Sequence, residues 1–282
     1  MENKRGNIRI LSWNINCLPR IATVVARKPH DRVLGILNHL SRMQANIDII
    51  VLQEVFRPDV RELLQKRLLD WQLCTINHPR CAFYEYGSGL FVAYRRSVVE
   101  HISAEFYKFP LPSRAMEDLF VRKGVLVVKC GINNNNMLAT DRFVLLATHM
   151  QAYDYKWCKY ARSKQLGLLK DISRQYNDYH RIIVGDFNID AYNQQNPEYM
   201  HMLDILNAQD CIPSDKNKIS SISHPDKSKK AANKRRPDGI LFVSSSQNKA
   251  QVSTQGEILD YREYTDKFLT DHLPVHANIK FS

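Results

Sequence analysis

The sequence predicts an α/β fold, in which strands alternate with helices along the chain. Apolar residues alternate with polar ones over residues 8–14, take helical spacing over residues 31–43, and return to a buried-strand pattern over residues 47–52. A second helix begins near Pro58, because proline favours the first turn of a helix. This strand–helix–strand–helix order is typical of α/β units.

The composition is that of a globular protein. Of 282 residues, 44% are hydrophobic and 24% are charged, so the chain can bury a core of ordinary size. No repeat or shift in composition marks a boundary, and we expect a single domain over residues 1–282. Within it we expect residues 213–237 to be a solvated, flexible basic loop, with a phosphate- or membrane-facing arm as the alternative. Its basic residues are Lys216, Lys218, Lys227, Lys229, Lys230, Lys234, Arg235 and Arg236.

The net charge of +11 favours an anionic partner: nucleic acid, a phosphorylated solute or an acidic membrane surface. The six cysteines are scattered without a Cys-x-x-Cys pair, so we expect neither a disulfide framework nor a zinc site. No secretory signal and no bilayer-length apolar run is visible. We therefore expect a soluble monomer, cytoplasmic or peripherally associated with a membrane.

Further elements follow from the same patterns. Strands are predicted at residues 87–94, 124–129, 143–147, 181–184 and 238–243, with a last strand ending at Phe281, and helices at residues 159–172 and 199–206.

Polar side chains stand at the ends of these predicted strands. Carboxylates and amides suit a hard ion such as Mg²⁺, with Mn²⁺ as an alternative, and histidines can move protons near neutral pH. A metal and a general base are what phosphodiester hydrolysis needs, because water must be activated and phosphoryl charge stabilised. The residues are Asn14, Glu54, His149, Asp186, Asn188, Asp238, Asp271 and His272.

Each of these residues also has a purely structural interpretation. Glu54 could cap the following helix, His149 could be a core histidine, and Asp271 could be a helix N-cap. Asp186 and Asn188 suit any exit from a strand into a turn. The joint pattern is harder to explain by structure alone.

The motifs resemble the endonuclease/exonuclease/phosphatase superfamily over nearly the whole chain. In order they are Trp13-Asn14, Gln53-Glu54-Val55, Thr148-His149, Gly185-Asp186-Phe187-Asn188, Asp238 and Asp271-His272-Leu273-Pro274-Val275. Within it, four segments are most similar to the neutral sphingomyelinases. These are Leu52-Gln53-Glu54-Val55-Phe56, Gly87-Ser88-Gly89-Leu90, Asp118-Leu119-Phe120-Val121-Arg122-Lys123-Gly124 and Thr148-His149-Met150-Gln151-Ala152.

The resemblance implies a DNase I-like four-layer α/β sandwich, with two packed mixed sheets flanked by helices. It also implies a Mg²⁺-dependent phosphodiesterase site at one end of the sandwich. By resemblance, Glu54 is the main metal ligand, and Asn14 and Asp271 lie by the metal. His272 is then the general base, and Asp238 is the carboxylate that orients it.

The remaining roles are implied in the same way. Asp186 and Asn188 match the pair that positions the nucleophilic water and the phosphate. His149 matches a second histidine, which stabilises phosphoryl oxygens or protonates the leaving oxygen. Lys123, paired with Asp118, contacts the substrate phosphate.

For a neutral sphingomyelinase, water attacks the phosphorus of sphingomyelin at a membrane surface and gives phosphocholine and ceramide. A DNase-type endonuclease acting on nucleic acid, an inositol polyphosphate phosphatase, and an inactive lipid- or nucleic-acid-binding relative are the alternatives. Residues 21–26 and the aromatic residues Tyr261, Tyr264 and Phe268 could contact a membrane, although ordinary packing also explains them. The chain departs from the family pattern at Gly239, where an aromatic residue is usual, and at Thr270, where a serine is.

Overall fold

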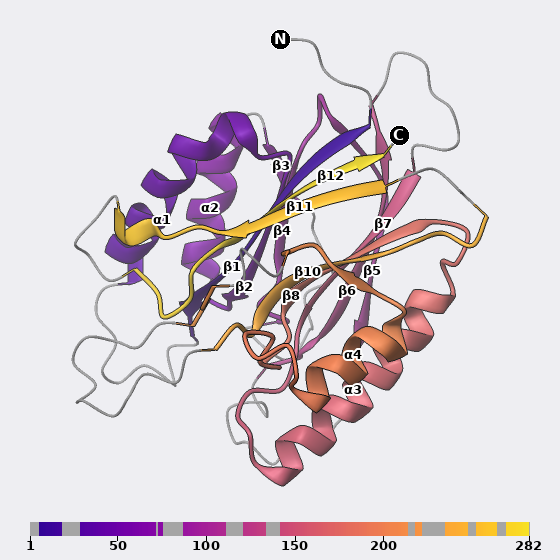
Figure 1. Cartoon of the computed structure of the whole chain (residues 1–282). Helices are drawn as coiled ribbons and strands as arrows, with labels where there is room; N and C mark the ends of the chain where they lie inside the picture. Colours follow the sequence, from indigo (N-terminus) through magenta and orange to yellow (C-terminus); the bar gives the residue numbers. More distant parts are fainter. Residues whose placement is uncertain are drawn as a thin grey trace.

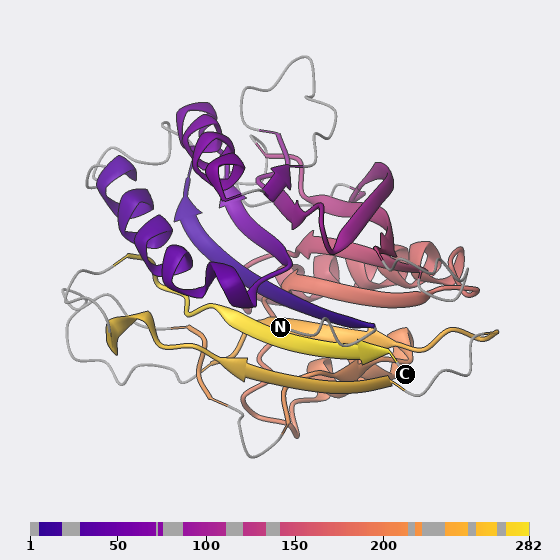
Figure 2. The same ribbon diagram turned by 90° about the horizontal axis from the view of Figure 1, so that it is seen from above.

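The computed structural model describes residues 6–18, 29–71, 73–75, 87–110, 121–133, 142–213, 218–221, 235–247, 252–263 and 269–281. Their strands form two six-stranded sheets. The sheets pack face to face, and helices cover the outer face of each (Figures 1 and 2). The predicted four-layer α/β sandwich is confirmed.

The first sheet is built from both ends of the described chain. Its strands are β1 (Asn7–Cys17), β2 (Ile49–Val55), β3 (Leu73–Thr75), β4 (Phe91–Arg95), β11 (Val252–Ile258) and β12 (Val275–Phe281). They lie in the order β11-β12-β1-β2-β4-β3. Only β1 and β2 are parallel neighbours, and the other neighbouring pairs are antiparallel.

The second sheet repeats this plan with the middle of the chain. Its strands are β5 (Val99–Lys108), β6 (Gly124–Ile132), β7 (Arg142–His149), β8 (His180–Asp186), β9 (Gln209–Asp210) and β10 (Asp238–Val243). They lie in the order β5-β6-β7-β8-β10-β9. Here β7 and β8 are the parallel pair, and the other neighbours are antiparallel.

Each parallel pair is joined by a helix, as a parallel connection requires. The helices are α1 (Pro29–Met43), α2 (Pro58–Asp70), α3 (Lys156–Arg174) and α4 (Pro197–Leu206). In sequence α1 lies between β1 and β2, and α3 between β7 and β8. Among the described helices, none has both the length and the apolar character needed to cross a bilayer.

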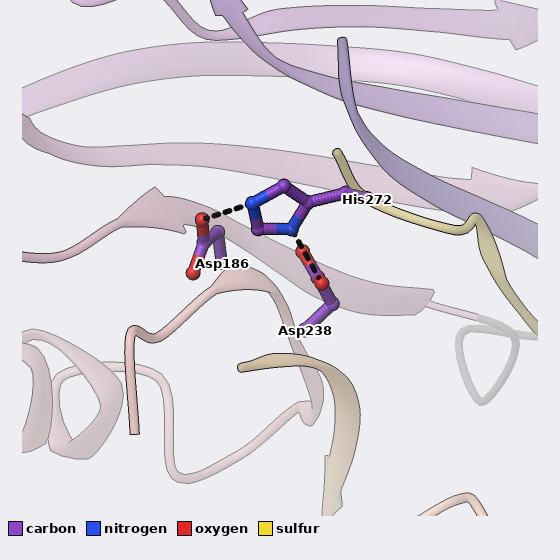
Figure 3. A group of neighbouring side chains, drawn as sticks. All are labelled: Asp186, Asp238 and His272. Atoms are coloured by element: carbon purple, nitrogen blue, oxygen red, sulfur yellow. Dashed lines mark hydrogen bonds and ion pairs between the residues drawn. The ribbon is translucent and has the colours of Figure 1, made fainter. Parts of the chain in front are cut away.

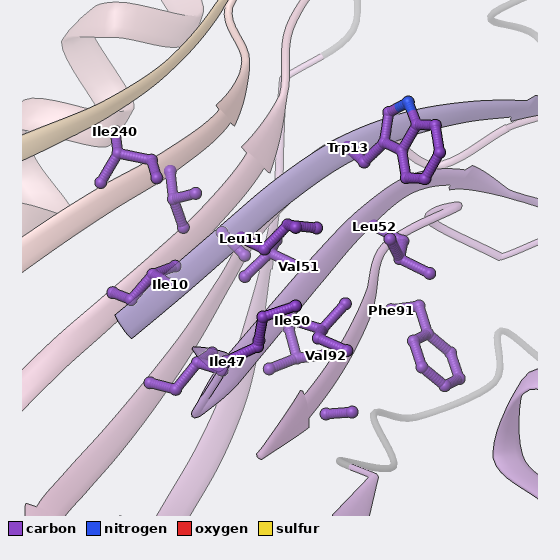
Figure 4. Packing of buried hydrophobic residues seen from close by; sticks show 14 of the residues in the cluster. Ile10, Leu11, Trp13, Ile47, Ile50, Val51, Leu52, Phe91, Val92 and Ile240 are labelled. Carbon is purple, nitrogen blue, oxygen red and sulfur yellow. The ribbon is translucent and has the colours of Figure 1, made fainter. Parts of the chain in front are cut away.

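The core follows the period-two alternation of the strands. In β7, Leu145 packs in the cluster between the sheets, whereas Leu146 packs in the cluster beneath α3 and α4. Ile240 of β10 belongs to the first cluster, together with buried side chains of β1, β2 and β4 (Figure 4). Because these strands are buried on both faces, the residues at their ends are held in fixed positions.

The structure corrects some predicted boundaries. Residues 87–90 form a turn, and the strand predicted at residues 87–94 begins only at Phe91. The strands β3, β5, β9 and β11 were not predicted. In β5 and β11 most side chains are exposed or half-buried, so these strands lack the apolar pattern that marks the central ones. Within the basic segment 213–237, residues 214–217 and 222–234 lie outside the described residues, and its flexibility stays a prediction.

Candidate active site

The carboxyl ends of β1, β2 and β8 meet around the side chain of Asn14. Its Nδ2 atom donates to Glu54 Oε1 and to Asp186 Oδ2, at 3.0 Å in each case. Glu54 lies near the end of β2 in the first sheet, and Asp186 ends β8 in the second. One buried amide therefore joins the two sheets and holds two carboxylates close together.

His272 is held between two carboxylates. Its Nδ1 atom lies 2.8 Å from Asp238 Oδ2, and its Nε2 atom lies 3.9 Å from Asp186 Oδ2 (Figure 3). The Ser220 hydroxyl donates to the same Asp238 oxygen at 2.6 Å. The antiparallel register of β8 and β10 sets Asp238 opposite Asp186. An acid at the start of one strand thus lies beside an acid at the end of its neighbour.

His149, the last residue of β7, lies next to both Glu54 and Asp186. Its Nε2 atom is 3.8 Å from Glu54 Oε1 and 3.7 Å from Asp186 Oδ2. Because β7 and β8 are parallel and in register, His149 and Asp186 are direct partners across the ladder. Both predicted histidines therefore approach the same oxygen of Asp186.

The backbone takes a left-handed conformation at three positions of the site. The φ angles are 48° at Asn16, 59° at Glu54 and 54° at Asn188. Asparagine tolerates this region, but it is uncommon for glutamate, and such conformations persist where the surrounding structure enforces them. Gly185, with φ 150°, lies so close to Thr148 that a Cβ atom would be 1.9 Å from that residue's carbonyl oxygen.

Burial changes the acidity of Glu54. It raises the pKa of this carboxyl to about 7, although the hydrogen bond from Asn14 lowers it, and the charge of Asp271 raises it further. A buried carboxylate whose ionised form is disfavoured gains from a nearby positive charge. A cation bound beside Glu54 would therefore stabilise its ionised form.

Asp186, Asp238 and His272 change one another's pKa. Burial opposes protonation of His272, but the charge and hydrogen bond of Asp238, together with Asp186, raise the pKa of His272 well above its ordinary value. Burial also disfavours the Asp186 anion, but His272 and His149 lower its pKa. The imidazolium and the carboxylates therefore stabilise one another.

The donor set fits a hard metal ion. Two carboxylates, the buried Asp186 and the half-buried Glu54, share the Asn14 amide, and oxygen atoms are the ligands that such ions prefer. Asp186, Asp238 and His272 also offer ligand atoms within 4.8 Å of one another. Asp238 Oδ2, however, already binds His272 and Ser220. A metal ion would therefore fit better on the Glu54 side of Asp186.

Asn14 and Asp271, the other two predicted ligands, are engaged with Asn16. The Oδ1 atom of Asn14 accepts from the Asn16 N–H at 3.0 Å, and Asn16 Nδ2 donates to Asp271 Oδ1 at 2.8 Å. The nitrogen of the Asn14 amide, not its oxygen, faces Glu54 and Asp186. Both residues lie at the site, and their role as metal ligands stays a prediction.

Lys123 and Asn188 meet at one backbone carbonyl. Lys123 Nζ donates to Met150 O at 2.9 Å, and Asn188 Nδ2 donates to the same oxygen at 3.2 Å. The Asn188 N–H also donates to Asp186 Oδ1 at 2.9 Å. These contacts bring Lys123 and Asn188 to the same site. Asp118, the predicted partner of Lys123, lies outside the described residues.

Sequence reasoning missed three residues of the site. Asn16 holds Asp271, Ser220 holds Asp238, and Arg235 Nη2 lies 3.5 Å from the Asn188 carbonyl. Asn16 carried a usable signal, because a second asparagine just after a strand end is suited to a left-handed turn. Ser220 and Arg235 belong to the basic segment 213–237, where no local pattern distinguishes them.

Comparisons with known proteins agree with this fold. Residues 11–202 match the model of the Endonuclease/Exonuclease/phosphatase family. No curated protein matches the chain by sequence.

Solved structures match the chain over nearly its full length. D. rerio TDP2, complexed with single strand DNA product, is 17% identical with a TM-score of 0.73, covering 97% of this chain and 99% of that one. Sphingomyelinase C from Streptomyces griseocarneus is 16% identical with a TM-score of 0.70, covering 96% and 99%. The human Nocturnin catalytic domain, with bound sulfate anion, is 20% identical with a TM-score of 0.66, covering 98% and 95%.

The structural likenesses show which fold the chain has, and the match to the family model shows which family it belongs to. The matched residues include four of the polar strand ends described above: Asn14, Glu54, His149 and Asp186. This chain belongs to the endonuclease/exonuclease/phosphatase family, whose members are metal-dependent hydrolases of phosphodiester bonds.

Proposed function

We propose that this protein is a Mg²⁺-dependent neutral sphingomyelinase, which hydrolyses sphingomyelin to ceramide and phosphocholine. The observation that carries the hydrolytic part is the pair His272–Asp238, with Nδ1 and Oδ2 2.8 Å apart, beside the acids Asp186 and Glu54. A base oriented by a carboxylate next to a metal-binding position is the equipment that water attack on phosphorus requires.

His272 is the general base of this proposal. Asp238 is placed to accept a hydrogen bond from the Nδ1–H group, so once the ring has lost its second proton it presents the lone pair of Nε2 to the side of Asp186. A water bound at Asp186 can then give its proton to Nε2 as its oxygen attacks. The negative charge of Asp238 stabilises the imidazolium that forms, as an orienting carboxylate does in a catalytic triad.

The other residues act on the phosphate. A bound Mg²⁺ would be held by Glu54 and would supply positive charge to the phosphoryl oxygens. Lys123 and Asn188, which share the Met150 carbonyl, can turn toward an anionic oxygen on the same side. His149, next to Glu54 and Asp186, is suited to stabilise a phosphoryl oxygen or to protonate the leaving ceramide oxygen.

The choice of sphingomyelin rests on sequence likeness. The segment Thr148-His149-Met150-Gln151-Ala152 resembles the neutral sphingomyelinase pattern, and a sphingomyelinase C is among the structures that share this fold. A nuclease is the second candidate, because the net charge of +11 also suits nucleic acid.

A side-by-side assay tests the substrate. Purified protein with Mg²⁺ is offered sphingomyelin dispersed in detergent, plasmid DNA and an inositol polyphosphate. We expect phosphocholine release without nicking of the plasmid and without phosphate release. Nicking alone would support the nuclease, and phosphate release alone the phosphatase; either result contradicts the proposal.

A matched pair of variants then ties turnover to this site. His272→Ala removes the base and is expected to abolish phosphocholine release. His101→Ala changes an exposed histidine of β5 and is expected to keep the wild-type rate. Equal rates in the two variants would refute the role given to His272.

A further inference from the structure

An exposed group of aromatic rings lies between the end of β7 and the first turns of α3. Tyr153, Tyr155 and Tyr160 are 47%, 65% and 59% exposed. Trp157, which lies between Tyr155 and Tyr160 in the sequence, is half-buried. We call these four residues the aromatic patch. Large aromatic side chains gathered at a surface mark a contact with a partner, because each one leaves apolar area in water.

Three rings of the aromatic patch lie next to one another. The centroids of Tyr155 and Trp157 are 6.1 Å apart with an interplanar angle of 10°, so these two rings stack. Tyr153 and Tyr155 are 6.2 Å apart and tilted by 41°. Tyr155 thus gathers two other rings beside it, while most of its own side chain remains exposed to an outside partner.

The charge around the aromatic patch is positive. Lys156, Lys159 and Lys164 are exposed, and the Lys164 ammonium lies 5.3 Å from the centroid of the Tyr160 ring. Asp154 is the one acidic residue between Tyr153 and Lys164, and it pairs with Arg162 and with Arg235, each at 3.2 Å. Rings and lysines therefore alternate on one surface with little negative charge.

The aromatic patch is fixed rigidly to the protein. Arg162 of α3 is fully buried and binds both oxygens of Glu198, at 2.6 and 3.0 Å. Its Nη1 atom donates to the carbonyls of Gln151, at 3.1 Å, and Tyr153. The loop after β7 is therefore held from the inside while its aromatic rings face outward.

The same loop is tied to the active site. It starts at His149, and the next carbonyl, that of Met150, accepts from Lys123 and Asn188. From the other side, Arg235 bridges Asp154 to the Asn188 carbonyl, at 3.2 and 3.5 Å. A surface that binds the aromatic patch is thus brought next to the phosphate-binding residues.

We propose that the aromatic patch, with Lys156 and Lys159, docks this protein onto the headgroup layer of a phospholipid bilayer that contains anionic lipid. Tyrosine and tryptophan favour that layer, because their apolar bodies enter it while their polar tips stay hydrated. Lysines beside them attract anionic headgroups. The inference rests on the proposed function, since docking there would deliver a membrane phosphodiester to the site.

A nucleic-acid strand fits the patch less well. Single-stranded nucleic acid binds aromatic residues by stacking its bases on open ring faces. In the aromatic patch Tyr155 is already stacked with Trp157, and the Lys164 ammonium lies over the Tyr160 ring. Tyrosine hydroxyls and lysine ammonium groups are the groups that a headgroup layer accepts.

Vesicle co-sedimentation tests the docking independently of catalysis. The full-length protein is mixed, in chelator to prevent turnover, with phosphatidylcholine vesicles that contain phosphatidylserine. We expect Lys156→Glu with Lys159→Glu to lower the partition coefficient at least about tenfold. We expect Tyr155→Ser with Tyr160→Ser to lower it also when salt screens the charges, because the ring contribution does not depend on ionic strength.

The matched control lies on the opposite helical layer. Lys66→Glu with Arg67→Glu changes two exposed basic residues of α2 by the same charge, and Leu69→Ser removes a side chain that is 67% exposed. These variants are expected to bind vesicles as the wild type does. Equal binding by the patch and control variants would overturn the inference.

A single-stranded oligonucleotide is added as a competitor. If it displaces the wild type from vesicles and the patch variants no longer bind it, the patch is a nucleic-acid surface and the inference is overturned. Failure of the docking and failure of the proposed function remain distinguishable. Turnover of detergent-dispersed sphingomyelin without vesicle binding would remove only the docking, and patch-dependent vesicle binding without turnover would remove only the sphingomyelinase.

Discussion

The Nδ1 atom of His272 lies 2.8 Å from Oδ2 of Asp238, and the second ring nitrogen faces Asp186 at 3.9 Å. His272 comes from the segment before β12 in one sheet, and Asp238 from β10 in the other. The packing of the two sheets therefore sets the tautomer of His272 and aims its free nitrogen. Chemistry that depends on this ring depends on how the sheets meet.

Replacing Asp238 by asparagine tests the orienting carboxylate. Asp238→Asn is expected to lower kcat/KM by about three orders of magnitude, because the ring loses both its fixed tautomer and the charge that stabilises the imidazolium. Asp238 also raises the pKa of His272. Its loss should therefore move the acid limb of the pH–rate profile to lower pH, and an unmoved limb would show that His272 does not titrate in it.

Ser220 is predicted to act through Asp238. Ser220→Ala removes the hydroxyl that donates to Asp238 Oδ2 at 2.6 Å, a hydrogen bond to a charged group worth about 2 kcal/mol. We expect kcat to fall roughly tenfold, since part of that energy orients the carboxylate, while KM changes little. Ser220→Thr, which keeps the hydroxyl, should restore much of the rate. A serine needed only for folding would lower the thermal stability of Ser220→Ala without this difference in kcat.

Glu54 makes the stability of the metal-free protein depend on pH. Its folded pKa is raised from 4.5 to about 7, so the fold prefers the neutral carboxyl. The stability that this preference contributes is present below pH 4.5 and is lost as pH rises to about 7. The difference amounts to about 3 kcal/mol. Chemical denaturation in chelator at several pH values measures it.

Glu54→Gln should flatten that pH dependence and abolish turnover. In the wild type, added Mg²⁺ binds the ionised carboxylate, so the rise in Tm that it causes should grow as pH increases toward neutral. Glu54→Gln should show a much smaller rise in Tm at every pH. An unchanged slope in chelator together with an unchanged response to Mg²⁺ would contradict the role of Glu54.

Gly185 is required by the close approach of β7. In Gly185→Ala the new Cβ atom would lie 1.9 Å from the Thr148 carbonyl oxygen, at a φ of 150°, so the strand ends that carry His149 and Asp186 must separate. We expect a loss of more than about 2 kcal/mol in the free energy of unfolding.

The matched control for this change is Gly167→Ala in α3. An added Cβ there would meet nothing within 4 Å, and alanine is the better helix former, so a gain of about 0.5–1 kcal/mol is expected. Urea denaturation of the two variants compares them directly. Similar stabilities would show that the contact between Gly185 and Thr148 does not limit the fold.

The sequence predicted the central part of the site because of a general property of parallel strands. Their carboxyl ends meet at one edge of a sheet, so His149 and Asp186 of the parallel strands β7 and β8 could be expected to converge. Glu54 lies near the end of a strand of the other sheet and reaches them because the two sheets pack face to face. Asp238, at the start of its strand, reaches them because β10 runs antiparallel to β8. Contacts across the sheet set the register between β8 and β10, so this register cannot be predicted from the residues near Asp238 alone.

Aromatic side chains in loops were harder to predict. Tyr261 was considered for a membrane contact, yet it is fully buried against Trp13, with ring centroids 5.6 Å apart, and its hydroxyl donates to Thr270 O at 2.6 Å. Its proposed companions Tyr264 and Phe268, like residues 21–26, lie outside the described residues. The exposed rings of Tyr153 and Tyr155 precede α3 and that of Tyr160 lies on it, whereas the apolar pattern of this helix marks only its buried face. Burial depends on which elements pack together, and local composition does not reveal it.

The central claim is that His272 and a Mg²⁺ ion at Glu54 together hydrolyse sphingomyelin. Its most direct measurement is phosphocholine release from detergent-dispersed sphingomyelin, with Mg²⁺ or with chelator, by the wild type, His272→Ala and His101→Ala. The account predicts release by the wild type and His101→Ala with Mg²⁺ alone, and none by His272→Ala. Release that persists in chelator, or that His272→Ala retains at the wild-type rate, would contradict it.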